Sequence, residues 1–268
     1  MKYLWAAIIT LWLVVAVYFY INYVLFHRYF GKAGKKKKPS EQIREQKNNS
    51  YERINISSAD EVILTAKLFT PENGDGQKSV LLCHGYRSDG EADFEKELEF
   101  YKSLDYNILL IDQRCHGKSA GDITSMGMTE SYDCVYWANW LELRFGTGCP
   151  MVIHGKGMGA FATLVGLASP ELPQNVERAV VSDVYDSVFQ QFSEAIQNKY
   201  GFWSKLIIPT VNMFYRTNTG FDMRDADIKN FAKKISVPVL FLNNGKETRA
   251  FNATKTAVSG VKLKSYLE

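Results

Sequence analysis

A glycine-rich turn in the middle of the chain has the spacing of a nucleophilic site. Residues 155–159 are Gly-Lys-Gly-Met-Gly, after the apolar run 151–153 and before a small, apolar stretch over 160–168. A strand that ends in a sharp turn and continues as a helix is the setting of a nucleophile elbow, where the centre of G-x-S-x-G is the attacking serine. The central residue here is Gly157, which has no side chain. The pattern predicts the architecture of a serine-nucleophile site without the nucleophile.

Two other glycine motifs are weaker candidates for chemistry. Gly117–Gly121 also spells G-x-S-x-G, but Ser119 lies in a loop several residues past its strand and no helix begins there. Because an elbow needs the strand to run directly into the serine turn, we expect Ser119 to be structural. Dinucleotide binding would need a glycine at position 160, which is Ala160, and the phosphate-loop spacing is missing. We therefore expect no cofactor.

Strand and helix patterns alternate from residue 51 onward, which predicts an α/β fold with a mostly parallel sheet and helices on both faces. A long aromatic-rich segment at about 186–230 exceeds a plain crossover and predicts a helical lid. Strands are expected at 51–56, 61–68, 79–83, 107–111, 151–153, 178–181, 238–242 and 261–267, and helices at 92–104, 126–145 and 160–168.

The N-terminus has the features of a membrane anchor. Residues 3–26 are 24 residues without a charge, enough to cross ~30 Å of hydrocarbon. The flank His27-Arg28 lacks the small residues of a cleavage site, which favours a retained anchor over 1–28 rather than a signal peptide. Six basic residues follow the span and only Lys2 precedes it, so we expect a single-pass protein with its domain on the cytoplasmic side.

A basic juxtamembrane linker is expected at 29–50. Its run Lys35, Lys36, Lys37 and Lys38 either contacts anionic lipid or only sets the topology.

Composition excludes some other functions. Residues 1–40 carry seven basic side chains and no acidic one, whereas the whole chain has 32 basic and 29 acidic residues. The folded part is therefore slightly acidic, which argues against nucleic-acid binding. The four cysteines have no C-x-x-C or metal-ligand spacing, so no zinc or other metal site is expected. We interpret them as buried structural thiols of a reducing compartment.

Several segments together resemble the α/β-hydrolase superfamily, specifically its serine esterases, lipases and S33-type peptidases with an N-terminal anchor. They are Leu82–Tyr86, Asp112–Gly121, the helix with Glu130, Asp133 and Trp137, His154–Ala160, Ser182–Tyr185 and Pro238–Leu242. The similarity covers residues 51–268 and implies an α/β-hydrolase domain with the lid inserted at about 186–230.

The resemblance also implies roles for single residues. Serine, histidine and an acid would form the triad, and two backbone amides the oxyanion hole. The amides would be those of Tyr86 and Met158, the nucleophile position is Gly157, and the acid candidate is Glu247. The catalytic histidine is expected after the last strand, but no histidine follows His154, so the C-terminus looks truncated. His84, His116 and His154 match structural histidines beside motif glycines, and His27 flanks the span.

The expected function is that of a membrane-anchored relative of serine hydrolases of acyl esters or peptides, with catalysis impaired because the elbow serine and the histidine are absent. The alternative is a non-catalytic binding or scaffold protein that keeps the pocket for a small apolar or acyl ligand.

Overall fold

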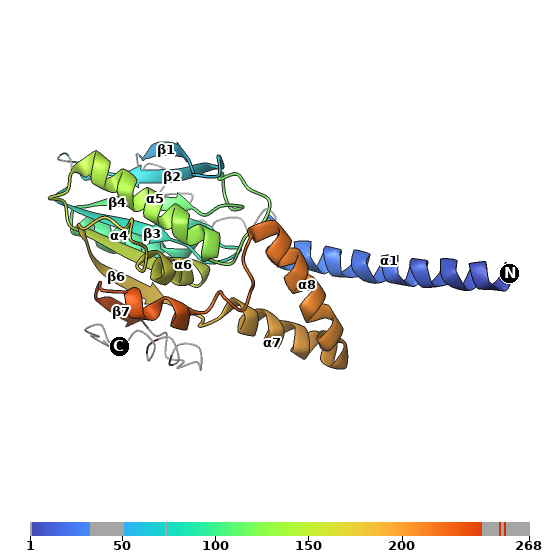
Figure 1. The fold of residues 1–268 in the computed structure, drawn as a ribbon. Helices are drawn as coiled ribbons and strands as arrows, with labels where there is room; N and C mark the ends of the chain where they lie inside the picture. Colours follow the sequence, from blue (N-terminus) through green and yellow to red (C-terminus); the bar gives the residue numbers. More distant parts are fainter. Residues whose placement is uncertain are drawn as a thin grey trace.

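The computed structural model describes residues 2–32, 51–72, 74, 76–242, 252 and 255. Its centre is a sheet of seven strands in the order β1-β2-β4-β3-β5-β6-β7 (Figure 1). Only β2 runs against its neighbours β1 and β4, so the predicted mostly parallel sheet is confirmed. The expected strand 261–267 lies outside the described residues. The strands are β1 (Glu52–Ser57), β2 (Ile63–Phe69), β3 (Lys78–Cys83), β4 (Tyr106–Asp112), β5 (Met151–Lys156), β6 (Val176–Ser182) and β7 (Val239–Leu242).

Both faces of the sheet are buried because side chains alternate along each strand. In β3, Leu81 and Cys83 belong to the larger apolar cluster, and Val80 and Leu82 to the smaller one on the opposite face. Helices α5 (Met128–Phe145) and α6 (Met158–Gly166) cover the larger cluster. Helices α3 (Gly90–Asp93) and α4 (Glu95–Ser103) cover the other, so the expected layers on both faces are confirmed.

The predicted helix over 92–104 is wrong in one respect, because the chain forms two helices there. The break falls at Phe94, whose φ of −115° and ψ of 21° are not helical. Its side chain is fully buried, and its ring lies 5.2 Å from that of His154. Burial of this ring under the sheet therefore decides the local backbone in a segment that is otherwise polar and helix-forming.

The N-terminal helix α1 (Lys2–Phe30) has an exposed part and a buried part. Over residues 3–30 it is long and apolar enough to cross a membrane, and no other helix in the described part of the chain meets that criterion. Leu25, Phe26 and Phe30, near its end, belong to the larger core cluster. The last turns of α1 are thus part of the folded domain, whereas the earlier turns are exposed. Lys35–Lys38 and the rest of 33–50 lie outside the described residues.

The aromatic-rich insertion between β6 and β7 is helical, as expected. Helix α7 (Val188–Tyr200) and helix α8 (Ser204–Thr219) are joined by the short 3-10 helix η2 (Gly201–Trp203). Two further 3-10 turns, η3 (Ile228–Asn230) and η4 (Ala232–Lys234), return the chain to β7. We call α7, η2 and α8 the helical hairpin; it projects from the sheet on the side where α1 leaves (Figure 1).

Candidate active site

The turn between β5 and α6 has the geometry of a nucleophile elbow. Gly157 is the single residue between strand and helix, with φ of 55° and ψ of −115°. Its amide donates to the Ser182 carbonyl at 2.9 Å, and its carbonyl accepts from the Phe161 amide at 3.1 Å. A positive φ of this kind strains any residue with a Cβ, and glycine adopts it freely. The sequence-predicted strand, turn and helix meet as expected.

The three glycines of the turn serve different purposes. A Cβ at Gly159 would lie 2.0 Å from the Cys83 carbonyl oxygen, and one at Gly155 would lie 2.4 Å from the Gly159 oxygen. Close packing of helix on strand therefore requires both. A Cβ at Gly157 would meet only the Cα of Gly85, at the ordinary distance of 3.6 Å. The space for a side chain at position 157 is present, and no side chain fills it.

A cavity of about 490 Å³ opens at this turn, beyond the carboxyl ends of the parallel strands. Gly157, Met158 and Tyr86 all line it, which brings together the predicted nucleophile position and the two residues expected to supply oxyanion amides. The loop that carries Tyr86 is held on both sides: the Gly85 amide donates to Asp93 at 2.7 Å, and the Arg87 amide donates to His116 at 2.9 Å. Ligands bind at this edge in open α/β sheets.

Comparison with known proteins supports the architecture. No protein-family model matches the chain. YqkD of Bacillus subtilis (strain 168) is 24% identical over 170 residues, which are 63% of this chain and 55% of that protein, so the chain spans about half the length of this curated relative. The esterase Pf2001 of Pyrococcus furiosus aligns with a TM-score of 0.62 at 20% identity, covering 87% of this chain and 88% of the esterase. The chain has an α/β-hydrolase fold.

Two more solved structures show the same fold. The esterase EaEST of Exiguobacterium antarcticum gives a TM-score of 0.55 at 14% identity, over 80% of this chain and 90% of the esterase. The α/β-hydrolase GrgF of Penicillium sp. sh18 gives a TM-score of 0.59 at 13% identity, over 81% of this chain and 89% of its own. At these identities the likeness concerns the fold, so what this α/β-hydrolase domain does depends on its own residues.

Two histidines of the α/β-hydrolase domain hold loops around the cavity. His84 Nε2 accepts from the Gln113 amide at 3.0 Å, so its Nδ1 carries the hydrogen and donates to the Gly85 carbonyl. His116 uses its two nitrogens in the same way, accepting from the Arg87 amide and donating to the Arg114 carbonyl. Both rings are therefore engaged with the backbone of the loops that line the site.

His154 is buried in β5 and shares a 3.2 Å hydrogen bond with the Tyr101 hydroxyl. Burial, with a smaller contribution from the Lys156 charge, lowers the pKa of His154 to about 3. The ring is thus neutral and faces the apolar cluster of α4, away from the cavity, since Leu98 and Tyr101 lie on that side of the sheet. Like His84 and His116, it is not among the residues that line the cavity.

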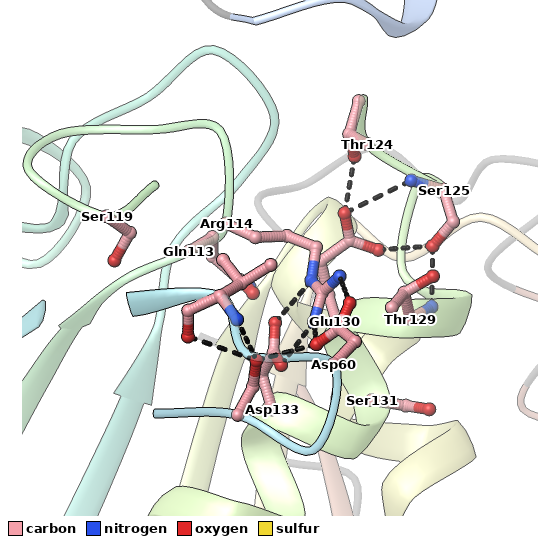
Figure 2. A network of polar contacts seen from close by, with 12 residues as sticks. Asp60, Gln113, Arg114, Ser119, Thr124, Ser125, Thr129, Glu130, Ser131 and Asp133 are labelled. Atoms are coloured by element: carbon pink, nitrogen blue, oxygen red, sulfur yellow. Dashed lines mark hydrogen bonds and ion pairs between the residues drawn. The ribbon is translucent and has the colours of Figure 1, made fainter. Parts of the chain in front are cut away.

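Ser119 lies in the loop after β4 and is 2% exposed. Its hydroxyl donates to the Asp112 carbonyl and accepts from the Thr65 amide at 2.8 Å, which ties this loop to β2. Figure 2 shows Ser119 on its own loop, apart from the acidic side chains at the start of α5. The G-x-S-x-G of residues 117–121 therefore closes a loop and forms no elbow.

A buried polar network joins that loop to α5 (Figure 2). Arg114 donates from Nε and Nη2 to Asp133 at 2.6 and 2.7 Å, and from Nη1 and the same Nη2 to Asp60 at 2.9 and 3.2 Å. The hydrogen bonds from Arg114 lower the pKa of Asp60 to about 2. Glu130, fully buried, accepts from the hydroxyls of Thr124 and Ser125 and from the Gly127 amide. The side chains of Arg114, Asp133 and Glu130 therefore hold loops in place. This structural role explains why these residues are part of the motifs that resemble the superfamily.

The acid candidate Glu247 lies outside the described residues. Asp183 was not singled out from the sequence as a site residue, yet it lines the same cavity as Gly157. It directly follows β6, is exposed, and has a positive φ of 51°. Its position at the carboxyl end of a parallel strand, next to the strand that enters the elbow, is the sequence feature that could have identified it as a site residue.

A second hollow, of about 580 Å³, lies at the opposite edge of the sheet. Pro150, Asn175 and Glu177 line it, at the amino ends of β5 and β6. It contains no elbow and no strand carboxyl end. The cavity at Gly157 therefore remains the candidate site.

Proposed function

We propose that this protein is a membrane-anchored relative of serine hydrolases of acyl esters or peptides whose own hydrolytic activity is impaired. The carrying observation is Gly157, which occupies the elbow with the backbone of a nucleophile and has no group to attack a carbonyl. The neighbouring solved structures that are esterases support the substrate class. An oxyanion hole and binding alone leave only ~10³–10⁴-fold acceleration over water.

Membrane anchoring is supported by the two-part character of α1. Its exposed turns are apolar, as they would be in lipid, and its last turns are buried in the domain at Phe26 and Phe30. Removal of α1 as a signal peptide would take core residues with it. We propose that the domain lies on the cytoplasmic side, since basic residues follow the span, and that Lys35–Lys38 contact anionic lipid.

A fluorophosphonate probe tests the central claim. In intact membranes the probe should not label the full chain covalently. An active serine hydrolase in the same membranes should be labelled and provides the positive control. Gly157→Ser should add little, because a lone hydroxyl is a poor nucleophile at neutral pH and no histidine ring lines the cavity in the described part of the chain. Labelling of the unaltered chain would overturn the proposal, and peptide mapping would show whether Ser119 carries the label.

A second candidate function, binding of a small apolar or acyl ligand without catalysis, is favoured by the preserved cavity. Octanoate should raise the melting temperature of the full chain. Gln191→Trp, on α7 at the cavity wall, should reduce that rise by filling the space. Gln190→Trp is the matched control, since Gln190 pairs with Glu194 on the same helix and does not line the cavity. An equal rise in both variants, or none in the unaltered chain, would remove this function.

A further inference from the structure

The helical hairpin carries an apolar face that no other described residue covers. Phe202, Leu206 and Met213 are exposed by 73%, 51% and 46%, and Pro209 between them is also exposed. The spacing of three and four residues places Leu206, Pro209 and Met213 on one side of α8, and Phe202 precedes them in η2. Trp203 beside them is 64% exposed. An apolar patch of this kind on a folded domain marks a contact with a protein or a membrane.

The hairpin lies against α1, which fixes its position relative to the proposed membrane span. The Tyr18 hydroxyl donates to the Leu206 carbonyl at 2.8 Å. Farther along, the Phe26 and Phe214 rings are 6.1 Å apart. Residue numbers rise together along both helices, so the start of α8 lies alongside the exposed apolar turns of α1 and its end lies beside the domain.

The C-terminal ends of α1 and α8 also lie side by side, since the Phe30 and Tyr215 rings are 5.0 Å apart. In α1 the first charge after the apolar span is Arg28, and on the exposed side of α8 the first charge after Met213 is Arg216. Between Lys205 and Arg216 α8 carries no charge, and beyond this run both helices change from apolar to charged toward the same end of the contact. This common change is what a shared membrane boundary would require of both.

Two lysines flank the aromatic tip of the hairpin. The Lys199 ammonium lies 5.3 Å from the Tyr200 ring centre, and the Lys205 ammonium lies 5.6 Å from that of Phe202. Both ammonium groups are therefore within cation–π range of an aromatic ring at the tip. Aromatic and lysine side chains together are typical of elements that lie in a membrane interface.

We propose that the tip of the helical hairpin, residues 199–206, inserts into the lipid leaflet in which α1 ends, as a second membrane contact beside the span. Figure 1 shows the hairpin and α1 leaving the sheet on the same side. This inference rests on the proposed membrane anchoring of α1. Because Gln191 of α7 lines the cavity at Gly157, the insertion would hold that cavity close to the leaflet, where a lipid-derived acyl ligand would reach it.

Depth-resolved fluorescence quenching of the full chain in vesicles of phosphatidylcholine and phosphatidylglycerol tests the proposal. The four native cysteines are buried, so single added cysteines accept an environment-sensitive dye selectively. Phe202→Cys reports the hairpin, Trp12→Cys reports the middle of α1, and Leu143→Cys, 86% exposed near the end of α5, reports the water-facing domain. All three positions are exposed in the structure, so the fold should tolerate the changes.

We expect the dye at 202 to be quenched by lipids with a shallow nitroxide, the dye at 12 by lipids with a deep nitroxide, and the dye at 143 by neither. Quenching at 12 without quenching at 202 would overturn the hairpin insertion and leave the anchor intact. Absence of quenching at 12 would refute the anchor itself. The dye at 202 could also be shielded from water and unquenched by lipid in a protein that cross-links to another copy of itself. This result would assign the apolar face of the hairpin to self-association, which also overturns the proposal.

Discussion

Alanine at Gly157 should destabilise the protein through backbone strain alone. The φ of 55° and ψ of −115° cost a non-glycine residue about 1–3 kcal/mol. The space is not limiting, because the new Cβ would lie 3.6 Å from the nearest atom. Alanine also reduces the entropy of the unfolded chain, which offsets about 0.4–1 kcal/mol. The middle of these ranges gives a net loss of about 1.3 kcal/mol, which should lower the melting temperature by about 3–5 °C, at ~2–4 °C per kcal/mol for a domain of this size.

Gly159→Ala is the informative comparison. At that position φ is negative, but the added Cβ would lie 2.0 Å from the Cys83 carbonyl oxygen, a backbone atom that cannot move without separating α6 from β3. The melting temperature should therefore fall further than for Gly157→Ala. Thermal unfolding of the full chain in detergent, followed by circular dichroism, measures both. Equal effects, or a higher melting temperature for Gly157→Ala, would refute the elbow geometry.

Three further outcomes are expected. The pKa of His154 is about 3 in the folded protein, so only the unfolded chain protonates this histidine as the pH falls from 6.5 toward 3. In urea unfolding, His154 should therefore contribute a loss of stability of up to ~1.4 kcal/mol per pH unit, and His154→Gln should abolish that contribution. The same dependence of stability on pH in both proteins would contradict this prediction. Glu130→Gln replaces an accepting oxygen with an amide NH2, which cannot accept from a donor such as the Gly127 amide. The free energy of unfolding should fall by about 1–3 kcal/mol in the same assay, and an unchanged value would show that the buried network is dispensable. Burial raises the pKa of Cys115 to about 12 and covers the other three thiols, so maleimide at neutral pH should label the native protein at none of its cysteines and the denatured protein at four.

The elements that carry the site could be predicted from the sequence because their signals are local. An apolar strand, a glycine turn and a small apolar helix are adjacent in the chain, so the strand, turn and helix of residues 151–166, with Gly157 in the turn, could be predicted from residue types alone. The same holds for the parallel strands, whose buried runs are short and regularly spaced, and for the uncharged stretch that forms α1.

Contacts between distant segments were decided by the tertiary structure. The break at Phe94 depends on a ring buried under a sheet whose other strands are far away in sequence, and helix propensity contains no such information. Asp183 became a cavity residue only when β6 was placed beside β5. The docking of α1 against α8 joins residues nearly two hundred positions apart, such as Tyr18 and Leu206. Local periodicity determines which faces are apolar, but packing in three dimensions determines which of them meet, and here it places the helical hairpin beside α1.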